Sequence, residues 1–159
     1  MTAHYDGIDT PIGAIYLILK GSLLAGVSIW QEPSGLKRGP VPACLAGQFR
    51  SYFEGALKAF DYPLLAPEGT DFERKIWLSL FDIPYGQTRS YKWIAERAGR
   101  PGASRAAGQA LSKNPLAIVL PCHRVIESGG GPGGYSPSPD IKRRLLDLEY
   151  YYSLHPARI

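Results

Sequence analysis

Two apolar runs near the N-terminus carry many β-branched and aromatic residues. They cover residues 12–19 and 23–30, and the short segment 20–22, which contains a glycine, separates them. Runs of this kind on either side of a short Gly-containing turn predict a β-hairpin. The stretch 32–42 that follows is rich in Gly, Pro and basic residues, which predicts a loop.

A helical spacing replaces this pattern between residues 44 and 57. Apolar residues recur there every four positions, at Leu45, Phe49, Phe53 and Leu57. Cys44, at the start of this predicted helix, has no neighbouring base, so we expect it to contribute to helix packing. Residues 1–68 show no catalytic constellation, and we interpret them as a supporting α/β domain.

The second half of the chain, residues 69–159, is mostly helical in pattern. Thr70 and Glu73 have the spacing of a capping box, which predicts a helix that ends before Pro84. A last helix starts near Asp140, and its apolar stripe consists of Ile141, Leu145, Leu148 and Tyr152. The expected fold class is therefore α+β, with a small N-terminal hairpin or sheet plus a helix, followed by a mostly helical domain.

Two short helices are predicted between these elements. Ser90 is expected to cap the first, over residues 91–98, and Ser104 to cap the second, over residues 105–113. A Gly-containing turn joins them, which is the layout of a helix-turn-helix. Small residues would let the second helix lie close to another surface, namely Ala106, Ala107, Gly108 and Ala110. The alternative is a helical hairpin that only packs inside the protein.

The charge of the chain is concentrated on this pair of helices. The formal net charge is +4, but residues 86–114 alone carry six basic side chains and one acidic one. A basic segment in an otherwise nearly neutral protein indicates a polyanionic partner such as nucleic acid. An ordinary solvated helix face is the alternative reading of the same charges.

Composition narrows the class of protein further. The 159 residues are 45% apolar and 20% charged, which is typical of a globular protein with a core of its own. No apolar run is long enough for a membrane span and the start lacks the pattern of a signal peptide, so we expect a cytoplasmic protein. The two cysteines, Cys44 and Cys122, lack zinc-ligand spacing, and we interpret both as reduced thiols.

Cys122 is the residue around which the second half is organised. The apolar run 116–120 follows Asn114-Pro115 and leads directly into Pro121-Cys122-His123-Arg124-Val125. We expect this run to be a buried strand that ends in a pocket, where an imidazole next to the thiol could activate it as a nucleophile. A small buried core cysteine is the alternative.

Glu149 is the candidate partner of the imidazole. It lies one helical turn beyond Leu145 and therefore at the edge of the buried face of the last helix. A carboxylate there is costly unless it is paired, and His123 can donate one ring N–H to it. A surface salt bridge with Arg or Lys is the alternative.

The glycine-rich segment 129–134 contains a literal G-x-G-x-x-G. The match is a false positive, because the segment is followed by Tyr135-Ser136 and prolines and not directly by a helix that could hold a pyrophosphate. We interpret it as a lid over Cys122 that ends in one aromatic residue.

Taken together, these motifs resemble the O6-alkylguanine-DNA alkyltransferases, also called methylated-DNA–protein-cysteine methyltransferases. The resemblance covers residues 70–150 in the order of the family, and the 10–13 segment fits the start of the family's N-terminal domain. It rests on Tyr91, Arg105-Ala106-Ala107-Gly108, Asn114-Pro115, the segment 121–125, Gly133-Gly134-Tyr135-Ser136 and Glu149.

The resemblance implies a single-turnover repair reaction without a cofactor. An alkyl carbon would move from guanine O6 to the sulfur of Cys122, and the thioether would not be hydrolysed. Glu149 would orient His123, which would deprotonate Cys122 through a bound water. Asn114 would tie the preceding turn to the site, and Tyr91 would donate a proton toward the departing guanine.

The resemblance also implies how the DNA is bound. Double-stranded DNA with O6-alkylguanine would bind through its minor groove, and the damaged nucleotide would rotate out of the stack. Arg105 would fill the vacated space, the backbones of Cys122 and Val125 would read the base edge, and Tyr135 and Ser136 would cover it. Residues of the first helix and the second helix would contact the DNA, namely Tyr91, Ser104, Arg105, Ala106, Gly108 and Lys113.

Some features depart from the family or leave alternatives open. Pro132 and Pro137-Ser138-Pro139 differ from the usual lid of the family, which would affect the rigidity of the lid and the range of large alkyl groups that the protein accepts.

Three other functions fit parts of the pattern: a non-catalytic binder of alkylated DNA, a DNA-binding regulator that senses alkylation, and a cysteine hydrolase. We expect a monomer, and the sequence leaves open cooperative assembly on DNA and activity on O4-alkylthymine.

Overall fold

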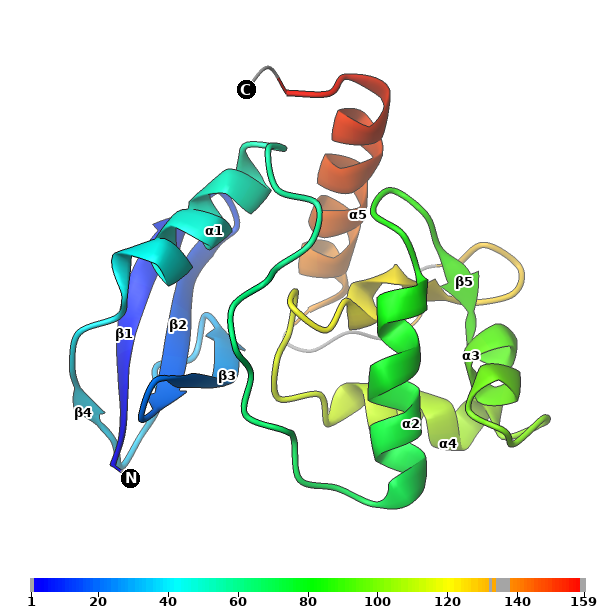
Figure 1. The fold of residues 1–159 in the computed structure, drawn as a ribbon. Coiled ribbons are helices and arrows are strands. Elements are labelled where there is room, and N and C mark those ends of the chain that lie inside the picture. The colour runs from blue at the N-terminus through cyan, green and yellow to red at the C-terminus, as the bar shows by residue number, and fades with distance from the viewer. Residues whose placement is uncertain (1, 132, 134–137, 158–159) are drawn as a thin grey trace.

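The computed structural model describes residues 2–131, 133 and 138–157. Figure 1 shows an N-terminal sheet with one helix on one side of the molecule and a group of helices on the other. The class is α+β, as predicted. Tyr135 and Ser136, two of the predicted site residues, lie outside the described residues.

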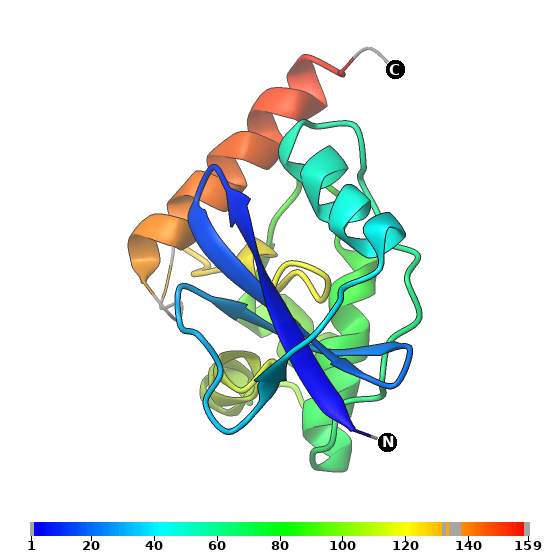
Figure 2. The ribbon, with the colours of Figure 1, turned by 90° about the vertical axis from the view of Figure 1, so that its left-hand side faces the viewer.

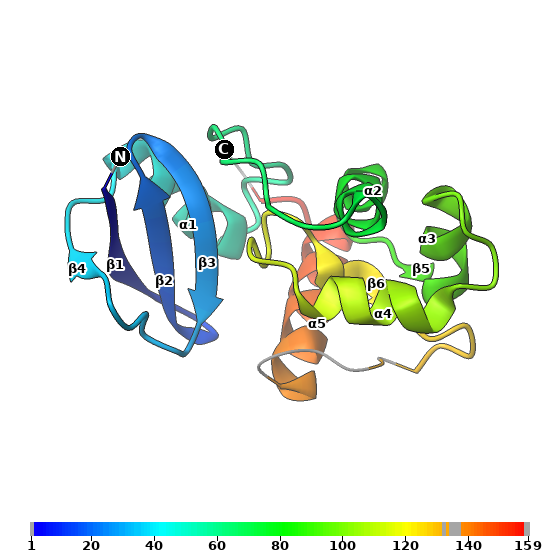
Figure 3. The ribbon, with the colours of Figure 1, turned by 90° about the horizontal axis from the view of Figure 1, so that it is seen from below.

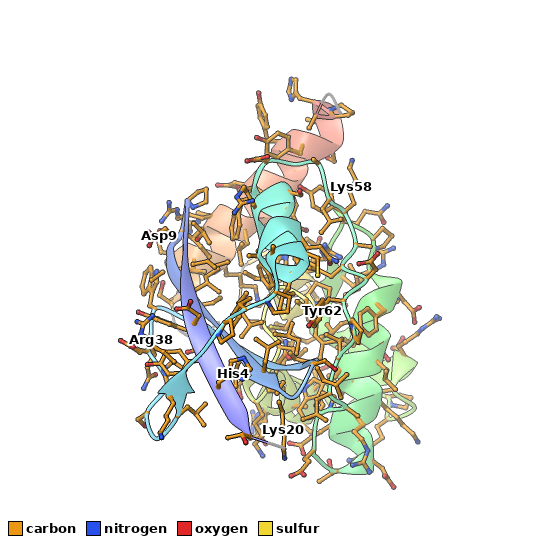
Figure 4. All side chains as sticks on the ribbon, turned by 60° about the vertical axis from the view of Figure 1, so that its left-hand side comes forward. His4, Asp9, Lys20, Arg38, Lys58 and Tyr62 are labelled. Atoms are coloured by element: carbon orange, nitrogen blue, oxygen red, sulfur yellow. The ribbon has the colours of Figure 1, made fainter. Side chains whose placement is uncertain are left out.

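The N-terminal sheet has four strands in the order β3-β2-β1-β4. The predicted hairpin is confirmed as the antiparallel pair of β2 (Gly13–Lys20) and β3 (Leu23–Ile29). The sequence analysis missed β1 (Ala3–Thr10), which pairs antiparallel with β2, and the short parallel edge strand β4 (Lys37–Arg38). Figure 4 shows His4 and Arg38 on these two strands, which form the edge opposite β3.

The helix α1 (Ala43–Phe53) packs against one face of this sheet (Figure 3). The predicted end at Leu57 was wrong, because Gly55 adopts a left-handed backbone with φ of 77° and turns the chain away. The prediction that Cys44 packs was also wrong, since its side chain is exposed. The helix buries instead the residues that share its other face, Leu45, Phe49, Tyr52 and Phe53.

The C-terminal helices begin and end close to the predicted positions. The capping box of Thr70 and Glu73 opens α2 (Asp71–Ser79), which continues into the 3-10 turn η1 (Leu80–Asp82). The Ser90 hydroxyl caps α3 (Tyr91–Arg97) by accepting a hydrogen bond from the Trp93 amide. The last helix is α5 (Pro139–Leu154).

The second helix of the predicted helix-turn-helix is α4 (Ser104–Ser112). Ser104 is its first helical residue and not its cap, because the preceding Ala103 occupies the cap position and has no side-chain hydroxyl. The chain reaches α4 from α3 through left-handed glycines at positions 99 and 102, as the predicted turn requires. The two helices pack against each other and against α2.

The apolar run before Cys122 was predicted as a strand, which is wrong. Residues 116–120 form a tight turn with isolated β-bridges, although the side chains of this run are buried as expected except for the partly buried Ala117. The chain then forms the 3-10 turn η2 (Cys122–Arg124) and the short strand β6 (Val125–Ile126), which pairs in parallel with β5 (Arg89–Ser90). No helix in the described part of the chain is long and apolar enough to cross a membrane.

The C-terminal end of α1 lies close to α5 (Figures 1 and 2). The backbone of Gly55 lies directly against the ring of Tyr152, and a Cβ atom at this position would overlap that ring. The left-handed backbone of Gly55 and this close approach both require glycine.

We predict that Gly55→Ala lowers the free energy of unfolding by about 2–4 kcal/mol, from left-handed strain and the overlap with Tyr152. Gly47→Ala is the matched control, because Gly47 lies inside α1 with open space around it. The control should raise stability by about 0.5–1 kcal/mol. Chemical denaturation measures the free energy of unfolding of both variants, and equal effects of the two substitutions would contradict the requirement for glycine at position 55.

Candidate active site

Asn114 closes the turn that leads to the candidate nucleophile. Its Oδ1 accepts a hydrogen bond from the Leu116 amide at 2.9 Å, and its Nδ2 donates to the Leu120 carbonyl at 2.8 Å. Between them Ile118 is held in the left-handed region, with φ of 74°, which is strained for a β-branched residue. The side chain of Asn114 thus takes the place of the strand pairing that the sequence pattern predicted.

Cys122 follows this turn at the start of η2. Its backbone N–H donates to the Leu120 carbonyl at 2.7 Å, and the residue is only 8% exposed. It lines a cavity of about 760 Å³ together with Tyr91, Asn114 and residues of α4. The thiol is therefore largely buried and yet reaches a space large enough for a small ligand, unlike the sealed core cysteine of the alternative reading.

His123 and Glu149 form a buried pair, with relative exposures of 0% and 1%. His123 Nε2 lies 2.7 Å from Glu149 Oε2. Burial alone would raise the pKa of Glu149, but the charge and hydrogen bond of His123, and those of Arg124, hold this pKa well below its usual range. An ionised carboxylate only accepts hydrogen bonds. In the neutral form of the His123 ring the proton therefore lies on Nε2, and Nδ1 is the acceptor.

Nδ1 of His123 is buried and makes no hydrogen bond within the part of the chain that the structure describes. His123 follows Cys122 directly in the chain, so a nitrogen with a free lone pair belongs to the residue next to the thiol in sequence. This arrangement can remove a proton from a neighbouring group.

Two more side chains bind Glu149, and the sequence analysis missed both as site residues. Arg124 donates from Nε to Oε1 at 2.8 Å and from Nη2 to Oε2 at 3.1 Å, and also from Nη1 to the Ile83 carbonyl. The Tyr52 hydroxyl of α1 donates to Oε2 at 2.6 Å. Glu149 therefore pairs with a basic residue, as one alternative supposed, but in the interior and in addition to His123.

Lys142 is a third buried polar residue that the sequence analysis missed. Its Nζ donates to the Val125 carbonyl at 2.5 Å and lies 3.4 Å from the Tyr91 hydroxyl. Burial lowers the pKa of Lys142 to about 8, although negative charges at Cys122 and Glu127 act in the opposite direction. Its burial could have been predicted from the sequence, because Lys142, Leu145 and Glu149 share one helix face.

The predicted DNA-contact residues lie at two places. Ser104, Arg105 and Gly108 of α4 line the cavity with Tyr91, and Arg105 is exposed. Ala106 lies on the same helix and is partly exposed. Lys113 instead forms an ion pair with Glu73 at 3.3 Å, which joins the end of α4 to the capping box of α2.

Gly133, in the glycine-rich segment, lies against Tyr91 at the cavity. A Cβ atom at Gly133, whose φ is 71°, would overlap the Tyr91 hydroxyl. Burial raises the pKa of Tyr91, and negative charges at Glu127 and Cys122 raise it further, so its hydroxyl stays protonated near neutral pH. Among the described residues there is no group of three or more His, Cys, Asp or Glu side chains that could hold a metal ion.

Comparison with known proteins agrees with this geometry. The family "6-O-methylguanine DNA methyltransferase, DNA binding domain" matches residues 71–151. The methylated-DNA–protein-cysteine methyltransferases of Methanosarcina acetivorans and Mycobacterium tuberculosis are 53% and 45% identical, over 92% of this chain and 97% and 92% of theirs. The crystal structure of M. tuberculosis OGT in complex with DNA superposes with a TM-score of 0.88 at 42% identity, covering 93% of each chain.

The helix-turn-helix pair and the buried Cys-His-Glu arrangement define a DNA-binding protein with a cysteine centre. The family match to residues 71–151, which is more than half of the chain, and the similarity to the two relatives show which family this protein belongs to. The chain belongs to the methylated-DNA–protein-cysteine methyltransferase family.

We predict that Glu149 makes stability depend on acid pH. Its pKa is lower in the folded protein than the 4.5 of an unperturbed carboxyl, so the unfolded chain binds more protons as the pH falls. The stabilisation is present above about pH 4.5 and is lost progressively below it. Urea unfolding between pH 3 and 6 should show this decline, and Glu149→Gln should flatten it; an unchanged slope in the variant would assign the decline to other carboxyl groups.

Proposed function

We propose that this protein repairs O6-alkylguanine in DNA by transferring the alkyl group to its own Cys122 in a single turnover. The observation that carries the proposal is that Cys122 lines a cavity bordered by α4, while the next residue, His123, is held by the buried Glu149 carboxylate. The names of the close relatives support the same reaction.

Activation of the sulfur starts from the His123 ring. A free thiol with a pKa near 8.5 is only a few per cent ionised at neutral pH, so a base must take its proton. Nδ1 of His123, made the acceptor by the hydrogen bond from Nε2 to Glu149, would take that proton through a bound water. The resulting imidazolium would be stabilised by the Glu149 carboxylate.

The transfer step exchanges one bond for another. The thiolate of Cys122 attacks the alkyl carbon, an S–C bond forms, the bond from carbon to guanine O6 breaks, and the electron pair stays on the guanine. The Tyr91 hydroxyl, which lines the same cavity, would donate a proton to the departing base. The thioether has no leaving group that water can displace, so the protein acts once and needs no cofactor.

The α3–α4 pair supplies the DNA-binding surface in this proposal. The target nucleotide would leave the stack and enter the cavity, at a cost of a few kcal/mol. Arg105, exposed in the first turn of α4, would occupy the gap from the minor groove. Ser104, Ala106 and Gly108 would lie against the sugar-phosphate backbone, and Lys113 at the far end of α4 would add positive charge.

The remaining assignments follow the family resemblance. The backbones of Cys122 and Val125 would read the base edge, while Tyr135 and Ser136 would cover the base. We also propose a boundary between two domains at residues 68 and 69, action as a monomer, and a cytoplasmic location, where a reduced thiol persists.

Mass spectrometry of the intact protein tests the proposal directly. After incubation with a duplex that contains O6-methylguanine, the protein should gain the mass of one methyl group, on the peptide that contains Cys122. Cys122→Ala should abolish transfer and retain DNA binding, because sulfur contributes little to phosphate contacts. Binding of the lesion without a mass gain by the wild-type protein would favour the non-catalytic lesion binder instead.

Gly108 provides a second test, of the surface that faces the DNA. A Cβ atom at this position would meet the Tyr91 ring at an ordinary distance of 3.7 Å, so the protein has room for alanine. We predict that Gly108→Ala raises the free energy of unfolding by about 0.5–1 kcal/mol. Duplex binding should nevertheless weaken by about tenfold, since a methyl group would stand between the helix and the minor groove.

Gly47→Ala is the matched control for this prediction. It makes the same exchange inside α1 and should stabilise the protein without changing the affinity for DNA. Fluorescence anisotropy with a duplex measures binding, and chemical denaturation measures stability. An unchanged affinity of Gly108→Ala would place the DNA on another surface.

A further inference from the structure

The hydroxyl of Tyr52 reaches the candidate active site from the N-terminal part of the chain. Tyr52 lies on α1, ninety-seven positions from Glu149 in the sequence, and its hydroxyl donates to Glu149 Oε2 in the interior at 2.6 Å. Burial and the negative charge of Glu149 raise the pKa of Tyr52 well above its usual value, so it remains a donor. Neither the Cys-His-Glu arrangement nor the helix-turn-helix requires this contact.

The distances around the carboxylate show that Arg124 does not hold it symmetrically. Arg124 approaches Oε1 at 2.8 Å but Oε2 at 3.1 Å, whereas Tyr52 and His123 approach Oε2 at 2.6 and 2.7 Å. A guanidinium and a carboxylate on their own prefer two parallel hydrogen bonds of similar length. Oε2 therefore lies closer to Tyr52 and His123 than to the guanidinium.

The ring of Tyr52 is fixed by other aromatic rings, which makes it a firm support. Its centroid lies 5.1 Å from that of Phe53, 5.6 Å from Phe60 and 6.1 Å from Tyr85. The residue is 1% exposed. A side chain packed in this way cannot follow the carboxylate if the carboxylate moves.

We propose that Tyr52 is a positioning residue that holds the Glu149 carboxylate toward His123 against the pull of Arg124. Through this contact the N-terminal sheet and α1 would control the activation of Cys122. The inference rests on the proposed function, because it assumes that His123 activates the thiol with the help of Glu149.

The substitution Tyr52→Phe removes the hydroxyl and keeps the ring. The carboxylate should then settle into a symmetric pair with Arg124, weaken its hydrogen bond to His123, and stabilise the imidazolium less. We expect the pH at which the Cys122 thiol becomes half-maximally reactive to rise by up to about one unit, and methyl transfer at pH 7 to slow by about tenfold at most. Near pH 9 the variant should approach the wild-type rate.

Two reactions should be followed between pH 5 and 9 for each protein. One is single-turnover methyl transfer from an O6-methylguanine duplex, and the other is alkylation of Cys122 by iodoacetamide, which needs no DNA. The other ionisable groups that face the carboxylate are Tyr85, His123 and Arg124, and those near Cys122 include Tyr91, Glu127 and Lys142. Tyr52→Phe leaves all of them in place.

Two comparisons isolate the contact. Tyr62→Phe is the matched control, because Tyr62 lies on the connection after α1 (Figure 4) and its hydroxyl donates only to the Ser22 carbonyl in the described structure; its pH profile should equal that of the wild type. In a Glu149→Gln background, adding Tyr52→Phe should change the rate by less than about twofold, because the charged acceptor is gone. Thermal unfolding and circular dichroism check that each variant is folded.

The outcomes separate this inference from the proposed function. A Tyr52→Phe profile identical to the wild type, or one lowered equally at every pH, would overturn the positioning role and leave the proposed function standing. If the wild-type protein does not methylate Cys122 from the duplex, the proposed function fails, and the iodoacetamide profiles still decide whether Tyr52 positions Glu149.

Discussion

The buried carboxylate of Glu149 is the interaction on which the rest of the structure depends. A charge in the interior is tolerated only when it is paired and its lone pairs are filled. Glu149 meets both conditions through three donors that come from α1 and η2, while it lies on α5 itself. Each donor satisfies part of a buried charge, so these contacts hold the three elements together.

The same requirement explains why the turn before Cys122 is so closely specified. His123 and Arg124 reach Glu149 only if the chain leaves residues 116–120 in the right direction. Asn114 fixes that direction with two hydrogen bonds. Ile118 has a strained left-handed backbone, and the burial of its side chain offsets that strain. Strain of about 1–2 kcal/mol at one residue is small beside the cost of misplacing a buried ion pair.

Local patterns predicted most of the elements but few of the contacts between them. The capping box at Thr70, the Ser90 cap and the β2–β3 hairpin depend on neighbouring residues, and the sequence predicted them correctly. β1 was missed because its alternation is weak, with Tyr5 as its single buried residue and a glycine in its middle. The turn at 116–120 was taken for a strand because an apolar run reports burial and not backbone direction.

The residues of the candidate site also fall into two groups, those that local sequence patterns predicted and those that depend on contacts with distant residues. Cys122, His123 and Glu149 were found because two are adjacent in sequence and the third lies on the edge of an apolar stripe. Tyr52 could not be recognised as a site residue, since its spacing within α1 is that of an ordinary core residue and its partner is distant in the chain. Lys142 was not considered in the sequence analysis, although its phase relative to Glu149 places it on the buried face of α5.

In the proposed reaction, the groups on the two sides of Cys122 have opposite roles in proton transfer. On the interior side, the His123-Glu149 pair would remove a proton from sulfur through a bound water and stabilise the positive charge that results. On the cavity side, Tyr91, with Lys142 next to its hydroxyl, supplies a proton to the leaving guanine. One proton leaves the thiol and one reaches the base, so the proposed reaction creates no net charge in the site.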